Sequence, residues 1–125
     1  MNTDKLLAAD LRERLLANSR QPDTDHVPIV KLFNPAGPAT WLATELDADG
    51  DTLFGLADLG MGCPELGSFS LSEIASLRLP FGLRIERDLS FRSDQPLSAW
   101  ATAARSTGSI LGAERLFASP RCQSD

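Results

Sequence analysis

Histidine, cysteine and tyrosine are scarce in this chain of 125 residues, which has one histidine, two cysteines and no tyrosine. With His26 alone, no pair of histidine ligands for a metal exists, and Cys63 and Cys122 do not have a metal-ligand spacing. We expect both cysteines to be free thiols, as in a reducing compartment. No apolar run approaches the roughly 18 residues of a membrane span, and the charged first twenty residues predict no signal peptide. These absences predict a cytoplasmic protein with no membrane partner, no cofactor and no bound metal.

Clusters of basic residues are missing as well. The formal net charge is −5, and the 12 lysines and arginines are scattered, with no three of them consecutive. A protein that binds duplex DNA gains its affinity from clustered basic side chains that displace counterions from phosphates. We therefore expect no direct binding to duplex DNA, while an acidic surface is compatible with a basic protein partner.

The apolar pattern predicts a central β-hairpin over residues 40–59. Its two strands flank the turn ADGD, and an Asp-Gly pair favours such turns because glycine adopts a positive φ without steric cost. Trp41 and Leu42 place apolar side chains on both faces, so we expect layers that cover the sheet on each side. Further strands are expected at 29–33, from Phe69 to Leu71, and at 83–91, where apolar and polar residues alternate strictly.

Helical spacing of leucines predicts an amphipathic helix over residues 4–18, with Thr3 as its N-cap. A short helix is expected after Ser70 or Ser72. A C-terminal helix is expected to start at Ser93 or Asp94, to bury Trp100 and to end at Gly108. The fold class that follows is α+β: a single domain over 1–125, with a mostly antiparallel sheet and an N-terminal and a C-terminal helix packed on it. Its core spans roughly 3–107, and 108–125 form a C-terminal extension.

The segment DLGMGCPELG, residues 58–67, is the most distinctive stretch. It lacks the lysine of a phosphate-binding loop and precedes a strand instead of a helix, and its carboxylates would repel a phosphate. We interpret it as a wide turn with positive φ at Gly60, Gly62 or Gly67. A second interpretation is a recognition loop in which Asp58, Met61 and Glu65 contact a partner.

Two metal or enzyme hypotheses involve carboxylates. The segment DADGD, residues 47–51, resembles the start of an EF-hand loop, but Gly50 comes two positions too early and the flanking segments are strands. We therefore favour a solvated hairpin turn. The alternative function is a small enzyme or metal-binding protein that gathers His26 with Glu45, Asp58 or Glu65 around a divalent ion or a water. Outside this hypothesis, we interpret His26 as a surface loop residue.

Residues 3–107 carry a family resemblance. The pattern of KLF, the WL hairpin, FGLADLGMGCPELG and a late IERD resembles the bacterial domain of unknown function 2958. Cys63 departs from that pattern, in which a bulkier apolar residue is usual. The resemblance implies a protein encoded on a plasmid or another mobile genetic element, and it assigns no catalytic or binding residue. We expect a non-enzymatic protein-binding or anti-defence accessory factor.

Overall fold

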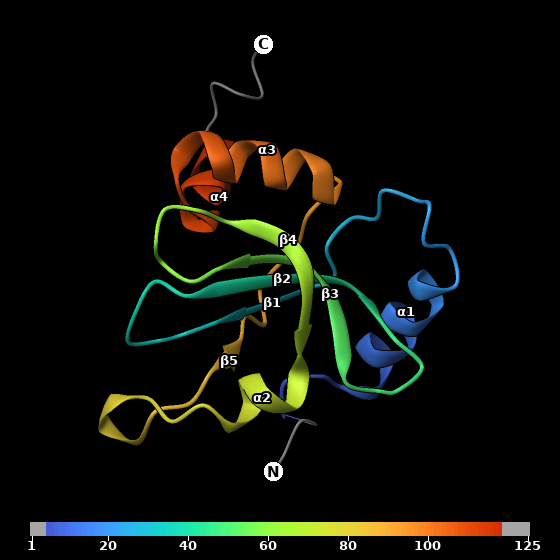
Figure 1. Ribbon diagram of the computed structural model, residues 1–125, viewed down its shortest axis with the longest axis horizontal. Coiled ribbons are helices and arrows are strands. Elements are labelled where there is room, and N and C mark those ends of the chain that lie inside the picture. The colour runs from blue at the N-terminus through green and yellow to red at the C-terminus, as the bar shows by residue number, and fades with distance from the viewer. Residues whose placement is uncertain (1–4, 119–125) are drawn as a thin grey trace.

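The computed structural model, which describes residues 5–118, has three layers. A five-stranded antiparallel sheet lies between two layers of helices, so the predicted α+β fold is confirmed (Figure 1). The strand order is β4-β3-β2-β1-β5. The strands are β1 (Val30–Phe33), β2 (Thr40–Leu46), β3 (Thr52–Asp58), β4 (Glu65–Ser70) and β5 (Glu86–Arg87).

The β2–β3 hairpin is central, as predicted. Leu42 on β2 lies opposite Leu56 on β3, and both side chains are fully buried. A register shift between Ala43 and Glu45 interrupts the otherwise regular pairing. Because β2 and β3 have neighbours on both sides and helices on both faces, most of their positions are buried and carry apolar residues.

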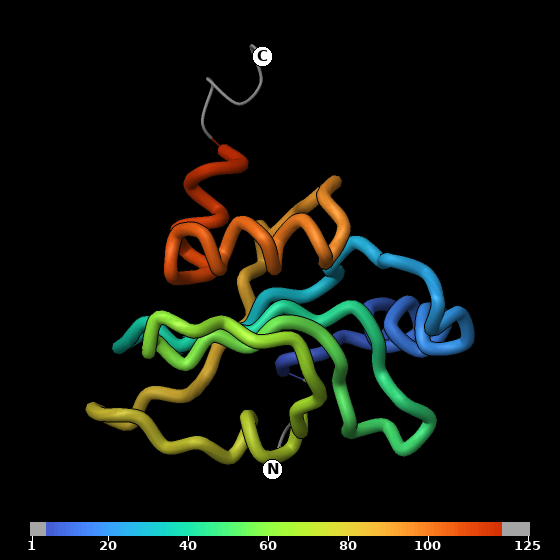
Figure 2. The backbone as a smooth tube through the Cα atoms, turned by 45° about the horizontal axis from the view of Figure 1, so that its top comes forward, coloured from blue at the N-terminus to red at the C-terminus, as the bar shows by residue number. Residues whose placement is uncertain are grey.

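Each face of the sheet is covered by its own pair of helices (Figure 2). On the α1/α2 face, Trp41 packs with Leu15 of α1 (Ala9–Ser19) and Ile74 of α2 (Leu71–Ser76) in one apolar cluster. On the α3/α4 face, Leu42 packs with Trp100 of α3 (Leu97–Thr107) and with α4 (Ile110–Ala118). Both tryptophans are therefore core residues, as expected.

The first helix is shorter than predicted. It begins at Ala9, and its N-cap residue Ala8 makes no side-chain hydrogen bond. The predicted cap, Thr3, lies outside the described residues. Leu6 and Leu7 precede the helix and are still buried. Their apolar spacing reflects docking onto the sheet, which a turn achieves as well as a helix does.

The predicted strand over 83–91 is mostly wrong. Only Glu86–Arg87 forms a strand, which pairs with β1. The chain then turns, because the Asp88 carboxylate accepts the Ser90 N–H at 2.9 Å, and Leu89 is left 80% exposed. Local side-chain bonding by aspartate competes with the ladder of a strand, which strict alternation alone does not reveal.

The start of β4 also differs from the prediction. The strand begins at Glu65, four residues before the predicted start at Phe69. The predicted N-cap of α2 is confirmed, because the Ser70 hydroxyl accepts the Glu73 N–H at 3.1 Å.

Helix α3 begins later than predicted. Neither Ser93 nor Asp94 caps it; Asp25, from the loop before β1, accepts the Ser98 N–H at 3.1 Å. Ser93 accepts instead from the indole N–H of Trp100 at 2.8 Å. The C-terminal end is as predicted, with Gly108 in the left-handed region at φ 88°.

Candidate functional site

The segment 58–67 connects β3 to β4 as a hairpin loop. Gly60 and Gly62 have φ of 83° and 82°, so the predicted glycine turn is confirmed at these two positions. Gly67 is the exception: it lies inside β4, opposite Gly55, and does not have a positive φ. A strand follows the loop, so the loop lacks the helix N-terminus that a phosphate site of the P-loop type uses.

Asp58 is the anchor of this loop. Its side chain is 1% exposed; one carboxylate oxygen accepts the Gly60 N–H and the other accepts the N–H of Ile110, each at 2.8 Å. A buried carboxylate between two backbone donors is satisfied within the fold. Of the three predicted recognition residues, Asp58 therefore has almost no surface of its own to offer.

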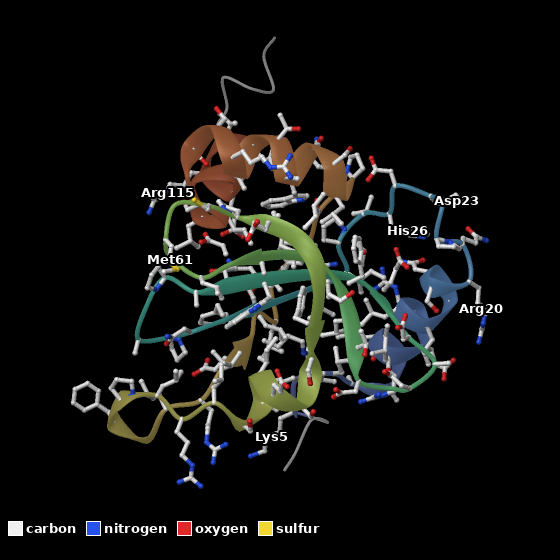
Figure 3. The ribbon with its side chains drawn as sticks, viewed as in Figure 1. Lys5, Arg20, Asp23, His26, Met61 and Arg115 are labelled. Atoms are coloured by element: carbon white, nitrogen blue, oxygen red, sulfur yellow. The ribbon has the colours of Figure 1, made fainter. Side chains whose placement is uncertain are left out.

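Met61 and Glu65 lie on the surface. Met61 is 80% exposed and its neighbour Leu59 is 60% exposed; Figure 3 shows Met61 at the periphery of the molecule. Glu65 is exposed and lies opposite Ala57, which packs on the α1/α2 face, whereas Asp58 bonds to α4 on the other face. The two carboxylates of the segment thus leave the sheet on opposite faces, which argues against a shared metal ion.

The carboxylates of the turn at 47–51 are used within the turn. Asp49 accepts the backbone N–H groups of Asp51 and Thr52, each at 2.8 Å, and these bonds together with that from the Thr52 hydroxyl lower its pKa. Asp51 accepts from Ser70 and from the Ser72 N–H at 2.7 Å each, which lowers its pKa in turn. Within residues 5–118, no group of three or more histidine, cysteine or acidic side chains is placed to hold a metal.

His26 and Glu45 are brought together. Both line a shallow cavity of about 160 Å³ between the loop before β1 and the sheet. Burial raises the pKa of Glu45, and the nearby His26 opposes that shift. Asp58 does not join His26 and Glu45 in the hypothetical metal or enzyme site. Glu45 pairs with Phe54, whereas Asp58 pairs with Thr40 at the other end of the β2–β3 hairpin.

An ion triad around the buried Lys31 was not predicted from the sequence. Lys31 on β1 is 7% exposed; its ammonium nitrogen lies 2.8 Å from a carboxylate oxygen of Glu114 on α4 and 3.4 Å from one of Asp88. A cavity of about 310 Å³ adjoins Lys31 and Asp88 and is walled mainly by the turn between β1 and β2. The three residues are far apart in sequence, and no spacing signals their meeting.

Residues 80–83 form a tight turn. Phe81 has φ 63° and ψ 24°, Gly82 has φ 72°, and the Leu83 N–H donates to the Pro80 carbonyl at 3.3 Å. These values describe a type I′ turn, whose first central position favours asparagine, aspartate or glycine. Phe81 occupies that position with 95% of its surface exposed. A strained bulky residue without core contacts is a feature that clusters at functional sites.

The 58–64 loop and the 77–85 segment lie at one end of the molecule, beside the turn that joins β1 to β2 (Figures 1 and 2). We call this the loop end. It contains the exposed Leu59, Met61 and Phe81, and between Leu77 and Ile85 its only charged residues are arginines: Arg78 and Arg84.

Comparison with known proteins identifies one family. The chain matches, over residues 6–111, the family described as "Protein of unknown function (DUF2958)", and it therefore belongs to this family. The resemblance drawn from the FGLADLGMGCPELG pattern is thereby confirmed. Searches among curated proteins and among solved structures return no match. Over residues 5–118, no helix is long and apolar enough to cross a bilayer.

Proposed function

We propose that this DUF2958 protein is a cytoplasmic, non-enzymatic accessory factor of a mobile genetic element that acts by binding another protein through its loop end. The resemblance stated above supports the setting, because it implies carriage on plasmids and similar elements. A component of the host's defence or of the element's own machinery is the partner class that this setting favours. The family's description leaves the activity itself open.

The observation that carries the proposal is the Phe81 turn. A phenylalanine in the left-handed region costs of order 1–3 kcal/mol, and burial of its ring does not offset that cost because the side chain is 95% exposed. Aromatic side chains on a fixed backbone are enriched at the centres of protein interfaces, since they bury much area with little loss of freedom. Arg78 and Arg84 lie three residues before and after Phe81 in the chain, and their positive charges suit a partner surface that carries carboxylates around an apolar pocket.

The glycine loop supplies a second set of contacts. Leu59 and Met61 are exposed on a loop whose backbone is held by the hydrogen bonds of Asp58 to Gly60 and Ile110. The loop is therefore ordered before a partner binds. Preorganisation lowers the entropy lost on binding. Glu65, at the start of β4, adds a negative charge beside these apolar groups. In this proposal Met61 and Glu65 make direct contacts, and Asp58 holds the loop in shape.

The competing functions receive less support. For catalysis, Asp58 is bonded within the fold, and Glu65 lies on the opposite face of the sheet. For duplex DNA, two arginines at the loop end of a chain with net charge −5 provide few phosphate contacts. We accordingly propose that duplex DNA is not a ligand, although a DNA-binding protein is an acceptable partner.

The test is affinity purification of the tagged full chain from a host that carries intact defence systems. We expect one protein recovered in a fixed molar ratio, and binding of that purified protein weakened at least about 10-fold by Phe81→Ala or Met61→Ala. Val27→Ala is the matched control, because Val27 is an exposed apolar residue that follows His26 in the chain. His26 lies on the opposite side of the molecule from Met61 (Figure 3).

Two results would contradict the proposal. One is the absence of any stoichiometric partner. The other is a partner whose affinity responds to Val27→Ala as strongly as to Phe81→Ala, since binding would then not depend on the loop end.

A further inference from the structure

The two edges of the sheet differ in how they are protected. Strand β5 forms one edge with two residues only, Glu86 and Arg87, while β4 forms the other with six. Proteins commonly blunt an edge with prolines, lysines, bulges or a covering element. The sequence of β4, ELGSFS, contains neither proline nor lysine, and its single charge, Glu65, stands at the first position. Figure 1 shows β4 at the front of the view with no other element drawn over it.

The pairing with β3 determines which backbone groups of β4 face outward. The Leu71 N–H donates to the Asp51 carbonyl at 2.9 Å, so this pair is a hydrogen-bonded pair of the antiparallel ladder. Hydrogen-bonded and non-hydrogen-bonded pairs alternate along an antiparallel ladder. The backbone N–H and C=O of Gly67 therefore face β3, and those of Leu66 and Ser68 face away from it. Across the part of the chain that the structure describes, these outward groups have no hydrogen-bond partner.

Gly67 leaves a vacant position beside this open edge. No atom lies within 4 Å of the place that its Cβ would occupy, and its backbone is extended, so neither close approach nor turn geometry requires glycine there. Phe69 lies two residues further on the same strand and on the same face. A glycine on an edge strand is stabilised when an aromatic ring from a neighbouring strand covers it.

We infer that β4 pairs antiparallel with β4 of a second copy of this chain, so that two sheets join into one continuous sheet in a symmetric dimer. The pairing is self-complementary, because a two-fold axis through Ser68 sets the outward groups of Ser68 against those of Ser68 in the other copy. Leu66 of each copy then lies opposite Ser70 of the other.

The side chains of β4 suit this register. Phe69 of each copy lies opposite Gly67 of the other, where space is vacant. The two Glu65 carboxylates lie at opposite ends of the paired strands, about 20 Å apart along the strand direction, well beyond the screening length of roughly 8 Å at physiological salt. The remaining repulsion comes from two chains of net charge −5, so moderate salt strengthens the dimer.

Sedimentation equilibrium of the full chain tests the inference over about 1 μM to 1 mM. We expect a concentration-dependent species of twice the mass of the chain, with a dissociation constant that falls as salt is raised. Ser68→Pro removes only an outward N–H, and Ser68→Lys opposes two ammonium groups at the axis; each should raise the dissociation constant at least about 10-fold. Ser68→Ala keeps the N–H and is the control, with an unchanged constant.

Thermal melting of each variant separates loss of pairing from loss of fold. Ser68→Lys leaves the contacts of the monomer intact, so it remains informative if Ser68→Pro fails to fold. A parent chain that is monomeric at every concentration overturns the inference. A dimer that persists in folded Ser68→Lys also overturns it, because the contact then lies elsewhere, for instance at the loop end. If the edge instead binds an extended peptide of another protein, the parent chain alone would sediment as a monomer.

Discussion

The Asp58 carboxylate accepts the N–H of Ile110 at 2.8 Å, although 52 positions separate the two residues along the chain. Ile110 is the first residue of α4, whose opening N–H groups have no partner within the helix. Ser109 satisfies another of them, since its hydroxyl accepts the Gly112 N–H at 2.8 Å. The other oxygen of Asp58 accepts from Gly60. One buried side chain thus fixes the glycine loop and the last helix to each other.

Asp58→Ala is expected to destabilise the fold by about 3 kcal/mol, because it leaves two backbone donors without acceptors, that of Ile110 in a buried site. Asp58→Asn should recover part of this loss, since its amide oxygen replaces only one of the two acceptors. Equilibrium urea denaturation measures both, with Asp23→Ala in the exposed loop before β1 as the control. A loss below about 1 kcal/mol for Asp58→Ala would show that water replaces the carboxylate.

The glycines of the 58–67 segment should respond to alanine in a fixed order. Gly60→Ala is expected to cost most, because φ is 83° and the new Cβ would approach a carbon of Pro38 to 2.4 Å. Gly62→Ala keeps the unfavourable φ but has open space, so about 1 kcal/mol is expected. Gly67→Ala is the internal control, with a change within about 0.5 kcal/mol. Thermal or urea denaturation measures the series, and equal effects at all three positions would contradict the assigned turn.

The sequence predicted those elements whose signal is local and repeated. The central hairpin follows from apolar residues on both faces of β2 and β3 around an Asp-Gly turn, and the C-terminal end of α3 follows from Gly108. Gly55 is required for a reason that the local sequence does not indicate. A Cβ at Gly55 would lie 1.8 Å from the Leu42 carbonyl oxygen, a constraint that exists only once β2 is paired. Single-sequence patterns carry no information on such approaches.

The candidate site was predicted only in its outline. The positive φ of Gly60 and the exposure of Met61 followed from the loop's composition, whereas burial of Asp58 depends on α4, a helix distant in sequence. Phenylalanine is disfavoured at the first central position of a type I′ turn, so turn propensities do not predict this turn at Phe81. Lys31 resembles an ordinary solvent-facing residue of a strand until α4 covers it.

The Lys31 triad predicts a coupled response to removal of its carboxylates. Asp88→Asn or Glu114→Gln alone should cost about 1 kcal/mol, because the remaining carboxylate still neutralises the ammonium group. The double variant leaves a buried charge unpaired and should cost about 3 kcal/mol or more, which exceeds the sum. Lys31→Met, which removes the charge at similar volume, should rescue the double variant. Strictly additive losses in urea denaturation would show that water supports Lys31.

Asp51 predicts how stability depends on pH. Its pKa is lowered in the folded state by hydrogen bonds from the Ser70 hydroxyl and the Ser72 N–H, which tie the β2–β3 turn to the start of α2. The folded state therefore binds the Asp51 proton less tightly than the unfolded state does. Asp51 contributes stability above its ordinary pKa of 3.8, and that contribution is lost as pH falls through the lower folded value.

Asp51→Asn should accordingly reduce the free energy of unfolding at pH 7 and flatten its decline as pH falls below about 4. Asp49→Asn should act with the same sign, because hydrogen bonds from Thr52 and Asp51 lower the Asp49 pKa. Urea denaturation at a series of pH values measures the slopes, with Asp23→Asn as the surface control. Parallel curves for the parent and Asp51→Asn over this range would show that the carboxylate, although bonded to Ser70 and Ser72, does not link protonation to folding.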